Sequence, residues 1–297
     1  MSLTHLRADP ANPKHTLILG AGFVGTAAAR QLAGHGAVVD ALSSKDLDLL
    51  APGAADKLKS LLTPQTTLVV VSARAPVKNP QMLIENLQML EPITEALASI
   101  KPAHIVYVSS DAVYKDKDGP LSESSCAEPG SLHGAMHLAR EIVLADAAGE
   151  TPFAVVRPSL LYGAGDPHNG YGPNRFRRLA ATGETITLFG EGEERRDHIH
   201  IDDVGTLISN VVRHHSVGIL NIATGEVTSF RDIAERANAL AGGKSKIEGS
   251  PRVGAMPHNG YRPFDPAATY AAFPGFKYLS IDEGLAKAHA EAGRNGA

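Results

Sequence analysis

The chain has 297 residues, of which 43% are hydrophobic and 20% charged, and its formal net charge is -4. These values are typical of a globular protein with a sizeable core, and they argue against a nucleic-acid surface, which needs concentrated positive charge. The single cysteine, Cys126, excludes an intrachain disulfide and fits a reducing cytoplasm. No apolar run reaches the roughly 20 residues of a membrane-spanning helix, so no membrane partner is expected.

Residues 1–14 contain no apolar run, and we expect them to form a disordered tail rather than a secretory signal. From residue 15 onward, short apolar runs alternate with helical patterns. Strands are expected at 16–20, 37–42, 67–73, 104–110 and 153–159, and helices at 26–36, 54–62, 80–100 and 134–148. Apolar strands separated by helices predict a doubly wound α/β fold, a parallel sheet covered on both faces, over residues 15–161.

The character of the sequence changes at about residue 162. Residues 162–176, YGAGDPHNGYGPNRF, are rich in Gly, Pro and Asn and predict a long binding loop. Residues 185–204 suggest a strand, a turn and a second strand, residues 218–225 another strand, and Ser229 with Asp232 the start of a helix. We expect residues 162–297 to form mainly a smaller substrate-binding lobe, with some segments that return to the first domain.

The segment GAGFVG places Gly20, Gly22 and Gly25 in a G-x-G-x-x-G pattern between an expected strand and an expected helix. Such glycines let the backbone turn tightly and approach a pyrophosphate, which the amide groups of the helix N-terminus then bind. A tight turn with no ligand is the alternative. The context of a strand and a helix favours a dinucleotide.

The choice between NAD and NADP depends on the end of the second strand. Asp40 lies at the spacing of an acidic residue that binds the ribose of NAD, but two strand residues still follow it. The tip of the strand is expected at Ser43, Ser44 and Lys45, whose hydroxyls and positive charge suit a 2′-phosphate and favour NADP. Asp48 could contact the adenine amino group or be a surface carboxylate.

Several blocks in order, among them GAGFVG, SSDAVY, RPSLLYG and RRDHIHIDDV, make the chain resemble the extended short-chain dehydrogenase/reductase family. This family contains nucleotide-sugar epimerases, dehydratases and reductases, and the resemblance covers nearly the whole chain. It implies that Ser110 hydrogen-bonds the reacting oxygen of the substrate. The expected cofactor contacts are Gly20, Gly22, Phe23, Val24, Gly25, Ser43, Lys45, Asp48, Leu49, Ala73, Ser109 and His137.

The chain departs from the family at its acid/base motif. Members of the family carry Tyr-x-x-x-Lys, in which the lysine binds the nicotinamide ribose and lowers the pKa of the tyrosine. Here the two positions are His133 and His137, which lie on one face of the expected helix. Imidazole has a pKa of about 6.5, so His133 is able to act as acid or base without a cationic neighbour. His137 is able to hydrogen-bond a ribose, but it cannot supply the permanent charge of lysine.

Three hypotheses for this pair are open. His133 replaces tyrosine in a working oxidoreductase, or the site binds a cofactor and has lost its chemistry, or the pair binds a metal. A metal would need a third ligand, for which Asp111 and His168 are candidates, and we expect none. Two solvated histidines without a role are the remaining alternative.

The resemblance also implies a substrate side. Asp111 and Asn174 lie in its substrate segments, and Arg196 and Arg252 match positions that hold a diphosphate in the family. Guanidinium groups bind phosphate oxygens in pairs of hydrogen bonds. Surface ion pairs with Glu193, Glu194 or Asp197 are the alternative.

The sequence therefore predicts an NAD(P)-dependent oxidoreductase of the epimerase/dehydratase type that acts on a nucleotide sugar or a related hydroxyl or keto substrate. The catalytic residues would be Ser110, His133 and His137. A catalytically impaired NAD(P)-binding sensor or scaffold is the alternative. By analogy with the family, we expect a cytoplasmic homodimer that associates through residues 81–100 and 134–148.

Overall fold

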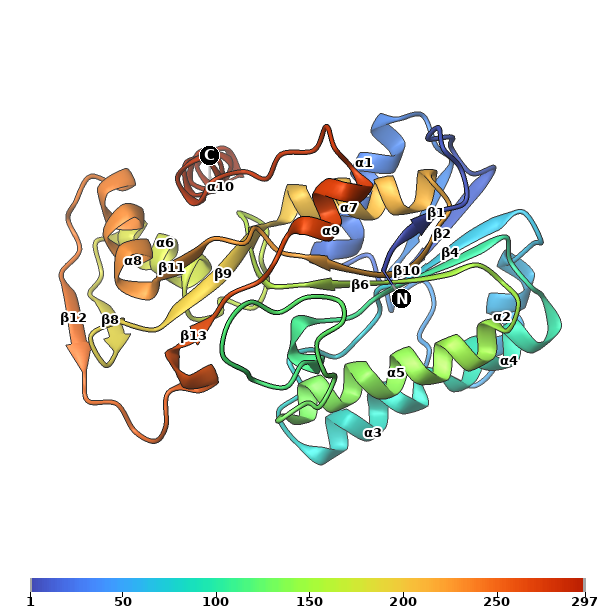
Figure 1. The fold of residues 1–297 in the computed structure, drawn as a ribbon, viewed down its shortest axis with the longest axis horizontal. Coiled ribbons are helices and arrows are strands. Elements are labelled where there is room, and N and C mark those ends of the chain that lie inside the picture. The colour runs from blue at the N-terminus through green and yellow to red at the C-terminus, as the bar shows by residue number, and fades with distance from the viewer. Residues whose placement is uncertain (1, 296–297) are drawn as a thin grey trace.

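A computed structural model describes residues 2–295 (Figure 1). The strands are β1 Thr4–His5, β2 His15–Leu19, β3 Val39–Leu42, β4 Thr66–Val70, β5 His104–Val108, β6 Phe153–Pro158, β7 Leu160–Tyr162, β8 Ile186–Phe189, β9 Arg195–His200, β10 Ser216–Ile222, β11 Val227–Ser229, β12 Ile247–Ser250 and β13 Tyr261–Arg262. The helices are α1 Phe23–Gly34, α2 Ala54–Leu61, α3 Pro80–Gln88, α4 Glu91–Ser99, α5 Leu132–Ala148, α6 Pro173–Thr182, α7 Ile201–Arg213, α8 Phe230–Leu240, α9 Ala267–Ala272 and α10 Ile281–Asn295. Two short 3-10 helices are η1 Asp111–Val113 and η2 Pro257–Gly260.

Within residues 2–295, the largest sheet has seven strands in the order β1-β10-β6-β5-β4-β2-β3. All its neighbouring strands are parallel except β1, which is antiparallel to β10. Helices α2, α3, α4 and α5 lie over one face of the sheet, and α1 and α7 lie over the other (Figure 1). The expected doubly wound parallel sheet is confirmed.

The core consists of two apolar layers, one on each face of this sheet. In β2, Leu17 and Leu19 pack into the layer under α2 and α4, whereas Ile18 packs into the layer under α1 and α7. Successive strand residues point to opposite faces. A strand buried on both faces must therefore be apolar throughout, which explains the continuous runs in the sequence.

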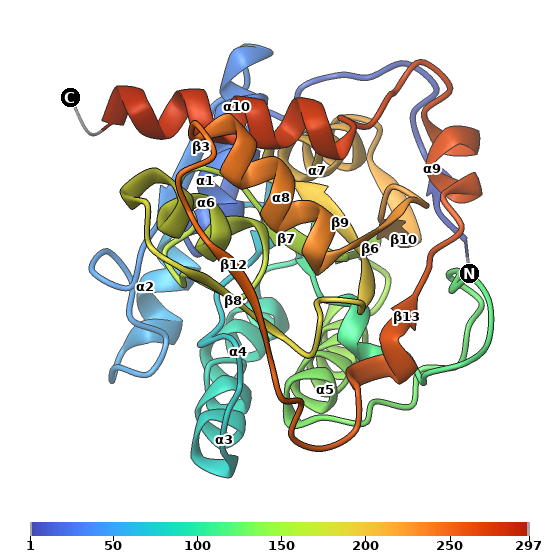
Figure 2. The ribbon, with the colours of Figure 1, turned by 90° about the vertical axis from the view of Figure 1, so that its left-hand side faces the viewer.

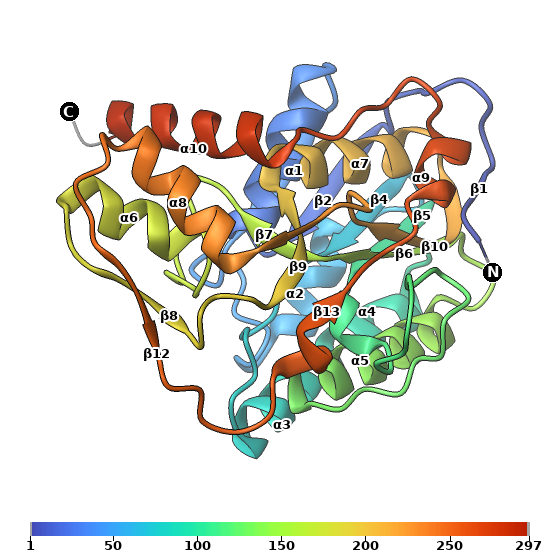
Figure 3. The ribbon, with the colours of Figure 1, turned by 60° about the vertical axis from the view of Figure 1, so that its left-hand side comes forward.

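The second lobe is built around a separate apolar cluster away from the main sheet. α6 and α8 pack together with the parallel pair of β8 and β12, and α10 crosses over α8 (Figures 2 and 3). The cluster includes Phe176, Ile186, Leu188, Phe230 and Ile233. A further small sheet consists of strands β7, β9, β11 and β13. It lies in space between this cluster and the main sheet (Figure 3). Two segments of residues 162–297 return to the first domain: β10 is a strand of the main sheet, and α7 packs on that sheet. The division at residues 161 and 162 stays a prediction.

Two expectations about the elements are wrong. Residues 2–14 are not a disordered tail, because Thr4 and His5 pair with β10 and the amides of Arg7 and Ala11 donate to the end of α7 and the residue after it. The single helix expected at 80–100 is two helices, α3 and α4. Pro92 explains the break, because proline has no amide hydrogen and its ring clashes with the carbonyl four residues earlier, where α3 ends.

No helix in the described part of the chain combines the length and apolar character that crossing a bilayer requires.

Helices α1 and α7 pack closely against each other, and this contact can be tested by substitution. A Cβ at Gly205 would lie 2.8 Å from the backbone carbon and oxygen of Ala27. We expect Gly205→Ala to lower the free energy of unfolding by about 1–3 kcal/mol, because the two helices must separate. Urea denaturation followed by circular dichroism measures this. Gly34→Ala is the control, since a Cβ there meets nothing within 4 Å, and equal stability of the two variants would contradict the close contact.

Candidate active site

A cavity of about 1410 Å³ lies at the carboxyl ends of the parallel strands. The ends of β2, β3, β4, β5 and β6, the start of α5, the loop of residues 166–174 and part of β9 form its wall. In doubly wound folds, ligands bind outside this edge of the sheet. The predicted site residues that line it are Gly20, Gly22, Phe23, Val24, Ser43, Asp48, Leu49, Ala73, Ser109, Ser110, Asp111, His133, His137, Asn174 and Arg196. Gly25, Lys45 and Arg252 are not among the residues that line the cavity.

The glycine-rich loop presents bare backbone to this cavity. Gly20 has a φ of 107°, and a Cβ there would lie 2.6 Å from the backbone nitrogen of Ser72. Gly25 lies beneath the loop, where a Cβ would be 2.0 Å from the oxygen of Gly20. Gly22 is the N-cap of α1 and makes no capping bond through a side chain. The first amide groups of α1 therefore remain available, and the loop fits a pyrophosphate.

A carboxylate that is not among the predicted site residues, Asp46, follows the end of β3. The backbone nitrogen and the hydroxyl of Ser43 both donate to Asp46, at 2.9 and 2.7 Å, and these hydrogen bonds lower the pKa of Asp46. Asp40 lies outside the cavity and pairs with His15 at 3.0 Å. The Ser43 hydroxyl thus already has a carboxylate partner.

The start of α5 is held tightly against η1. Ser131 caps the helix by accepting from the amide of Gly134 at 3.1 Å. A Cβ at Gly134 would lie 2.0 Å from the carbonyl oxygen of Ala112, so only glycine allows this approach. His133 and Ser110 consequently line the same cavity.

Ser110 acts locally as the N-cap of η1. Its Oγ accepts from the amide of Ala112 at 3.2 Å and donates to Oδ1 of Asp111 at 3.3 Å. The second of these bonds is long. The hydroxyl hydrogen is therefore available to a better acceptor that enters the cavity.

His133 and His137 are in contact, with ring centroids 4.7 Å apart and ring planes at 84°. Burial lowers the pKa of His133, an effect that the carboxylate of Asp111 opposes. Burial also lowers the pKa of His137 well below its ordinary value, and the neighbouring His133 and Arg140 lower it further. Both imidazoles are therefore neutral at pH 7, where a neutral His133 is a base.

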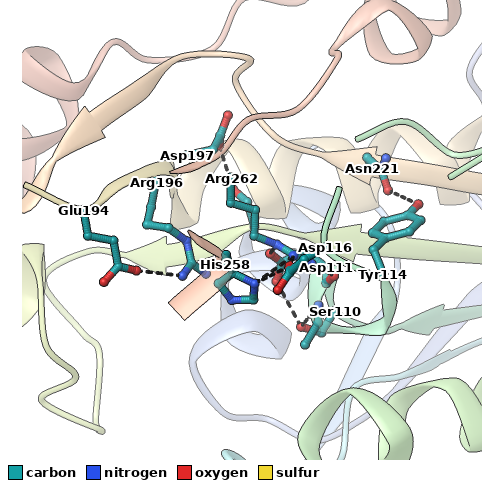
Figure 4. Close-up of polar contacts among 12 residues, drawn as sticks. Ser110, Asp111, Tyr114, Asp116, Glu194, Arg196, Asp197, Asn221, His258 and Arg262 are labelled. Atoms are coloured by element: carbon teal, nitrogen blue, oxygen red, sulfur yellow. Dashed lines mark hydrogen bonds and ion pairs between the residues drawn. The ribbon is translucent and has the colours of Figure 1, made fainter. Parts of the chain in front are cut away.

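Ser109 is hydrogen-bonded to the buried ion pair of Glu141 and Arg157. Its hydroxyl donates to Glu141 of α5 at 2.5 Å, and Glu141 also binds Arg157 of β6 through two hydrogen bonds of 2.9 and 2.5 Å. Arg157 in turn donates to the hydroxyl of Tyr114 at 2.8 Å, and Tyr114 donates to Asn221 at 2.7 Å (Figure 4). Glu141 and Arg157 were missed from the sequence, although charged residues inside the runs LARE and VVRPS were a signal for them.

Arg262 is a further residue that the sequence patterns do not reveal. It lies beside Arg196, because β13 pairs with β9 and brings the two residues into register. Arg262 donates to Asp111 Oδ2 at 3.1 Å and to the Asp111 carbonyl at 2.7 Å, and it also contacts Asp116. His258 binds Asp116 as well, at 2.5 Å (Figure 4). No local pattern predicts a pair separated by 151 residues.

The two predicted phosphate arginines share one carboxylate. Arg196 is buried and donates to Glu194 at 3.0 Å. Arg252 lies 4.0 Å from the other oxygen of Glu194 and donates to the carbonyl of Phe189. Because Arg252 does not line the cavity, the structure brings only Arg196 to the predicted substrate site.

Asn174 also lines the cavity, but its side-chain amide already forms hydrogen bonds with backbone groups. It accepts from the nitrogen of Gly163 at 3.0 Å and donates to the oxygen of Leu161 at 3.3 Å. These bonds hold the start of α6 against the end of β7.

The hypothesis of a metal pair required a third ligand. Within residues 2–295, no group of three or more His, Cys, Asp or Glu side chains is arranged to hold a metal ion. Asp111, one proposed ligand, is bound by Arg262.

The parallel sheet, the glycine cradle and the cavity at the strand ends define a Rossmann-type nucleotide-binding fold. The sequence model of the NAD dependent epimerase/dehydratase family matches residues 16–223. The chain therefore belongs to this family, as the resemblance of its motifs predicted.

The named relatives share only about a quarter of their aligned residues with this chain. A dTDP-L-rhamnose 4-epimerase of Burkholderia thailandensis is 25% identical over 86% of this chain and 89% of its own length. An uncharacterized UDP-glucose epimerase of Bacillus subtilis is 26% identical over 59% of this chain, and the match spans only 56% of that relative.

Solved structures share the fold at low identity. The UDP-glucose 4-epimerase of Thermus thermophilus in complex with NAD has a TM-score of 0.81 and 21% identity, over 95% of this chain and all of that one. A GDP-L-fucose synthetase of Naegleria fowleri bound to NADP has a TM-score of 0.80 and 16% identity, over 100% and 98%.

Proposed function

We propose that the protein is an NAD(P)-dependent oxidoreductase of the epimerase/dehydratase type that acts on a nucleotide sugar or a related hydroxyl or keto substrate. The observation that carries this proposal is that Ser110, His133 and the glycine loop line one cavity. Membership of the family, in which named relatives are nucleotide-sugar epimerases, supports it.

Ser110 and His133 would perform the proton chemistry. The Ser110 hydroxyl would leave its long bond to Asp111 and donate to the reacting oxygen of the substrate. Neutral His133 would accept the proton of a substrate hydroxyl during oxidation and return it during reduction. The nicotinamide would supply the hydride acceptor or donor.

Charges in the cavity limit the choice of substrate. Arg196 is the predicted phosphate ligand that lines the cavity, and a diphosphate would have to compete with Glu194 for it. A nucleotide-activated sugar satisfies this requirement, since a diphosphate carries more charge than a carboxylate. A neutral free sugar would leave Arg196 with its present partner.

The alternative is a cofactor-binding sensor or scaffold without turnover. The absence of lysine at position 137 and the carboxylate partners of Arg196 and Arg262 favour it. The experiment on the proposed function therefore has to separate binding from turnover.

We expect purified protein to react when NAD(H) or NADP(H) is added together with a panel of nucleotide sugars, as followed by absorbance at 340 nm and product mass. His133→Ala should lower kcat by about 10²- to 10⁴-fold, because it removes the acid/base group. Ser110→Ala should lower kcat by about 10²-fold. His35→Ala, at an exposed position after α1, is the matched control.

The pH dependence gives a second readout of the same reaction. Because burial lowers the pKa of His133, its basic form persists below the ordinary imidazole value of about 6.5. The oxidation rate should be constant around pH 7 and fall only below about pH 6.5, where His133 becomes protonated. The reduction rate should rise over the same range, because reduction needs the protonated form of His133. Tight cofactor binding with no reaction on the panel, and no effect of either variant, would favour the sensor instead.

We propose NADP as the cofactor, because the hydroxyl residues Ser43 and Ser44 line the cavity just past the tip of β3. Lys45 follows them but lies outside the lining, and we infer that Asp46 weakens the preference for NADP. The carboxylate of Asp46 is bound to Ser43, so it would repel a 2′-phosphate. Asp46→Asn should tighten NADPH binding about fivefold, equivalent to about 1 kcal/mol, and change NADH binding less.

Fluorescence titration with both reduced cofactors measures this ratio. Asp9→Asn, at an exposed position in the N-terminal segment, is the control. An unchanged ratio of the two dissociation constants in Asp46→Asn would show that Asp46 does not face the ribose.

We further propose a cytoplasmic homodimer that forms through residues 81–100 and 134–148, which correspond to α3, α4 and α5. Helices α3 and α5 pack side by side (Figure 1). Ile84 of α3 and Ile142 and Val143 of α5 are exposed. Sedimentation velocity should show a dimer at micromolar concentration, and Ile142→Glu should dissociate it. Val38→Glu, at an equally exposed position before β3, should not. A monomeric unsubstituted protein would exclude this interface, and fractionation of the source cells tests the location.

A further inference from the structure

The surroundings of His137 define what an imidazole at this position is able to do. His137 lies in the second turn of α5, is almost fully buried and lines the cavity. Its Nδ1 is 2.8 Å from the hydroxyl oxygen of Tyr107, which lies in β5. Its Nε2 has no hydrogen-bond partner within residues 2–295.

The hydrogen bond between Tyr107 and His137 assigns the proton on the ring. Tyr107 is 1% exposed, and its hydroxyl hydrogen needs an acceptor, because a buried donor without a partner costs about 1–3 kcal/mol. Nδ1 of His137 is the acceptor in reach. A neutral imidazole carries one hydrogen, so accepting at Nδ1 puts that hydrogen on Nε2.

Arg140 packs against the ring of Tyr107 and supports the hydrogen bond between Tyr107 and His137. Its side chain is fully buried, with the guanidinium carbon 5.6 Å from the centre of the Tyr107 ring. Two hydrogen bonds of 2.6 and 2.7 Å, to the carbonyl oxygens of Asn86 and Ser72, hold it in place. The permanent positive charge lies one turn beyond His137 and disfavours a second cation there.

Tyr107 itself remains protonated, since burial raises its pKa to about 12. The charged and titratable groups that face His137 are thus Tyr107 from β5, and His133 and Arg140 from its own helix. No carboxylate in the described residues contacts its ring to favour an imidazolium.

We propose that Tyr107 and Arg140 are positioning residues that hold His137 as a neutral imidazole with its hydrogen on Nε2, so that this position offers the cavity a hydrogen-bond donor and not a cation. The acceptor would be a hydroxyl oxygen of a bound dinucleotide. The identity of that acceptor rests on the proposed function. The state of the ring does not, because it follows from contacts within the protein.

The test of the ring state uses the unliganded protein. In long-range ¹H–¹⁵N spectra of protein labelled at histidine nitrogen, with His137→Gln to assign the signal, we expect the Nε2-protonated form and no titration between pH 5.5 and 8. An Nδ1-protonated ring, or a ring that titrates near the ordinary imidazole pKa, would overturn the proposal.

Variants separate the two positioning residues. Tyr107→Phe keeps the ring and removes the donor, so the His137 signals should shift toward exchange between the two tautomers. The dissociation constant for NADH or NADPH should rise about 3- to 10-fold. Tyr270→Phe, at a half-exposed position in α9, is the matched control. Unchanged His137 signals in Tyr107→Phe would refute its role.

Arg140→Met tests the charge. We expect His137 to begin to titrate within the measured pH range, and Arg140→Lys to restore the behaviour of the unsubstituted protein. A silent Arg140→Met would remove Arg140 from the proposal. If neither NADH nor NADPH binds, the proposed function fails, while the ring state measured without ligand still decides this inference.

Discussion

The buried ion pair between Glu141 of α5 and Arg157 of β6 is the interaction on which the geometry of the site depends. Two hydrogen bonds join the side chains, and removing one partner would leave a charge in the core at a cost of about 3–5 kcal/mol. The pair therefore fixes the rotation of α5 about its axis. His133 and His137 lie two turns and one turn before Glu141, on the same face of the helix. Because Glu141 must meet Arg157, both histidines must face the strand ends.

The same helix is fixed along its axis by contact with η1. Gly134 brings its backbone against the carbonyl of Ala112, and Ser131 caps the N-terminus of the helix. Rotation and translation of α5 are thus set by separate groups. The position of His133 relative to Ser110 follows from these two constraints, and neither depends on a ligand.

Local chemistry made much of the fold predictable, whereas the charges of the site depend on distant contacts. The strands follow from apolar runs, and the glycine cradle from its place between β2 and α1. The break at Pro92 was overlooked in the single helix expected at 80–100, although proline excludes a continuous helix. In contrast, Arg262 meets Asp111 across 151 residues, and Arg252 and Lys45 turn out to lie outside the cavity lining. Side-chain direction in loops depends on tertiary contacts that no short pattern contains.

The two histidine substitutions are chemically coherent as a pair. A phenol has a pKa of about 10 and needs a cation beside it to act as a base near neutrality, whereas imidazole does not. If His133 takes the place of the tyrosine, as proposed, one reason for a lysine at position 137 is removed. A cation there would also lower the pKa of His133 further, because like charges disfavour each other, and would deprive it of the acid form needed for reduction. In the proposed reaction, a neutral imidazole at position 137, with the permanent charge on Arg140, would leave His133 able both to accept and to donate a proton.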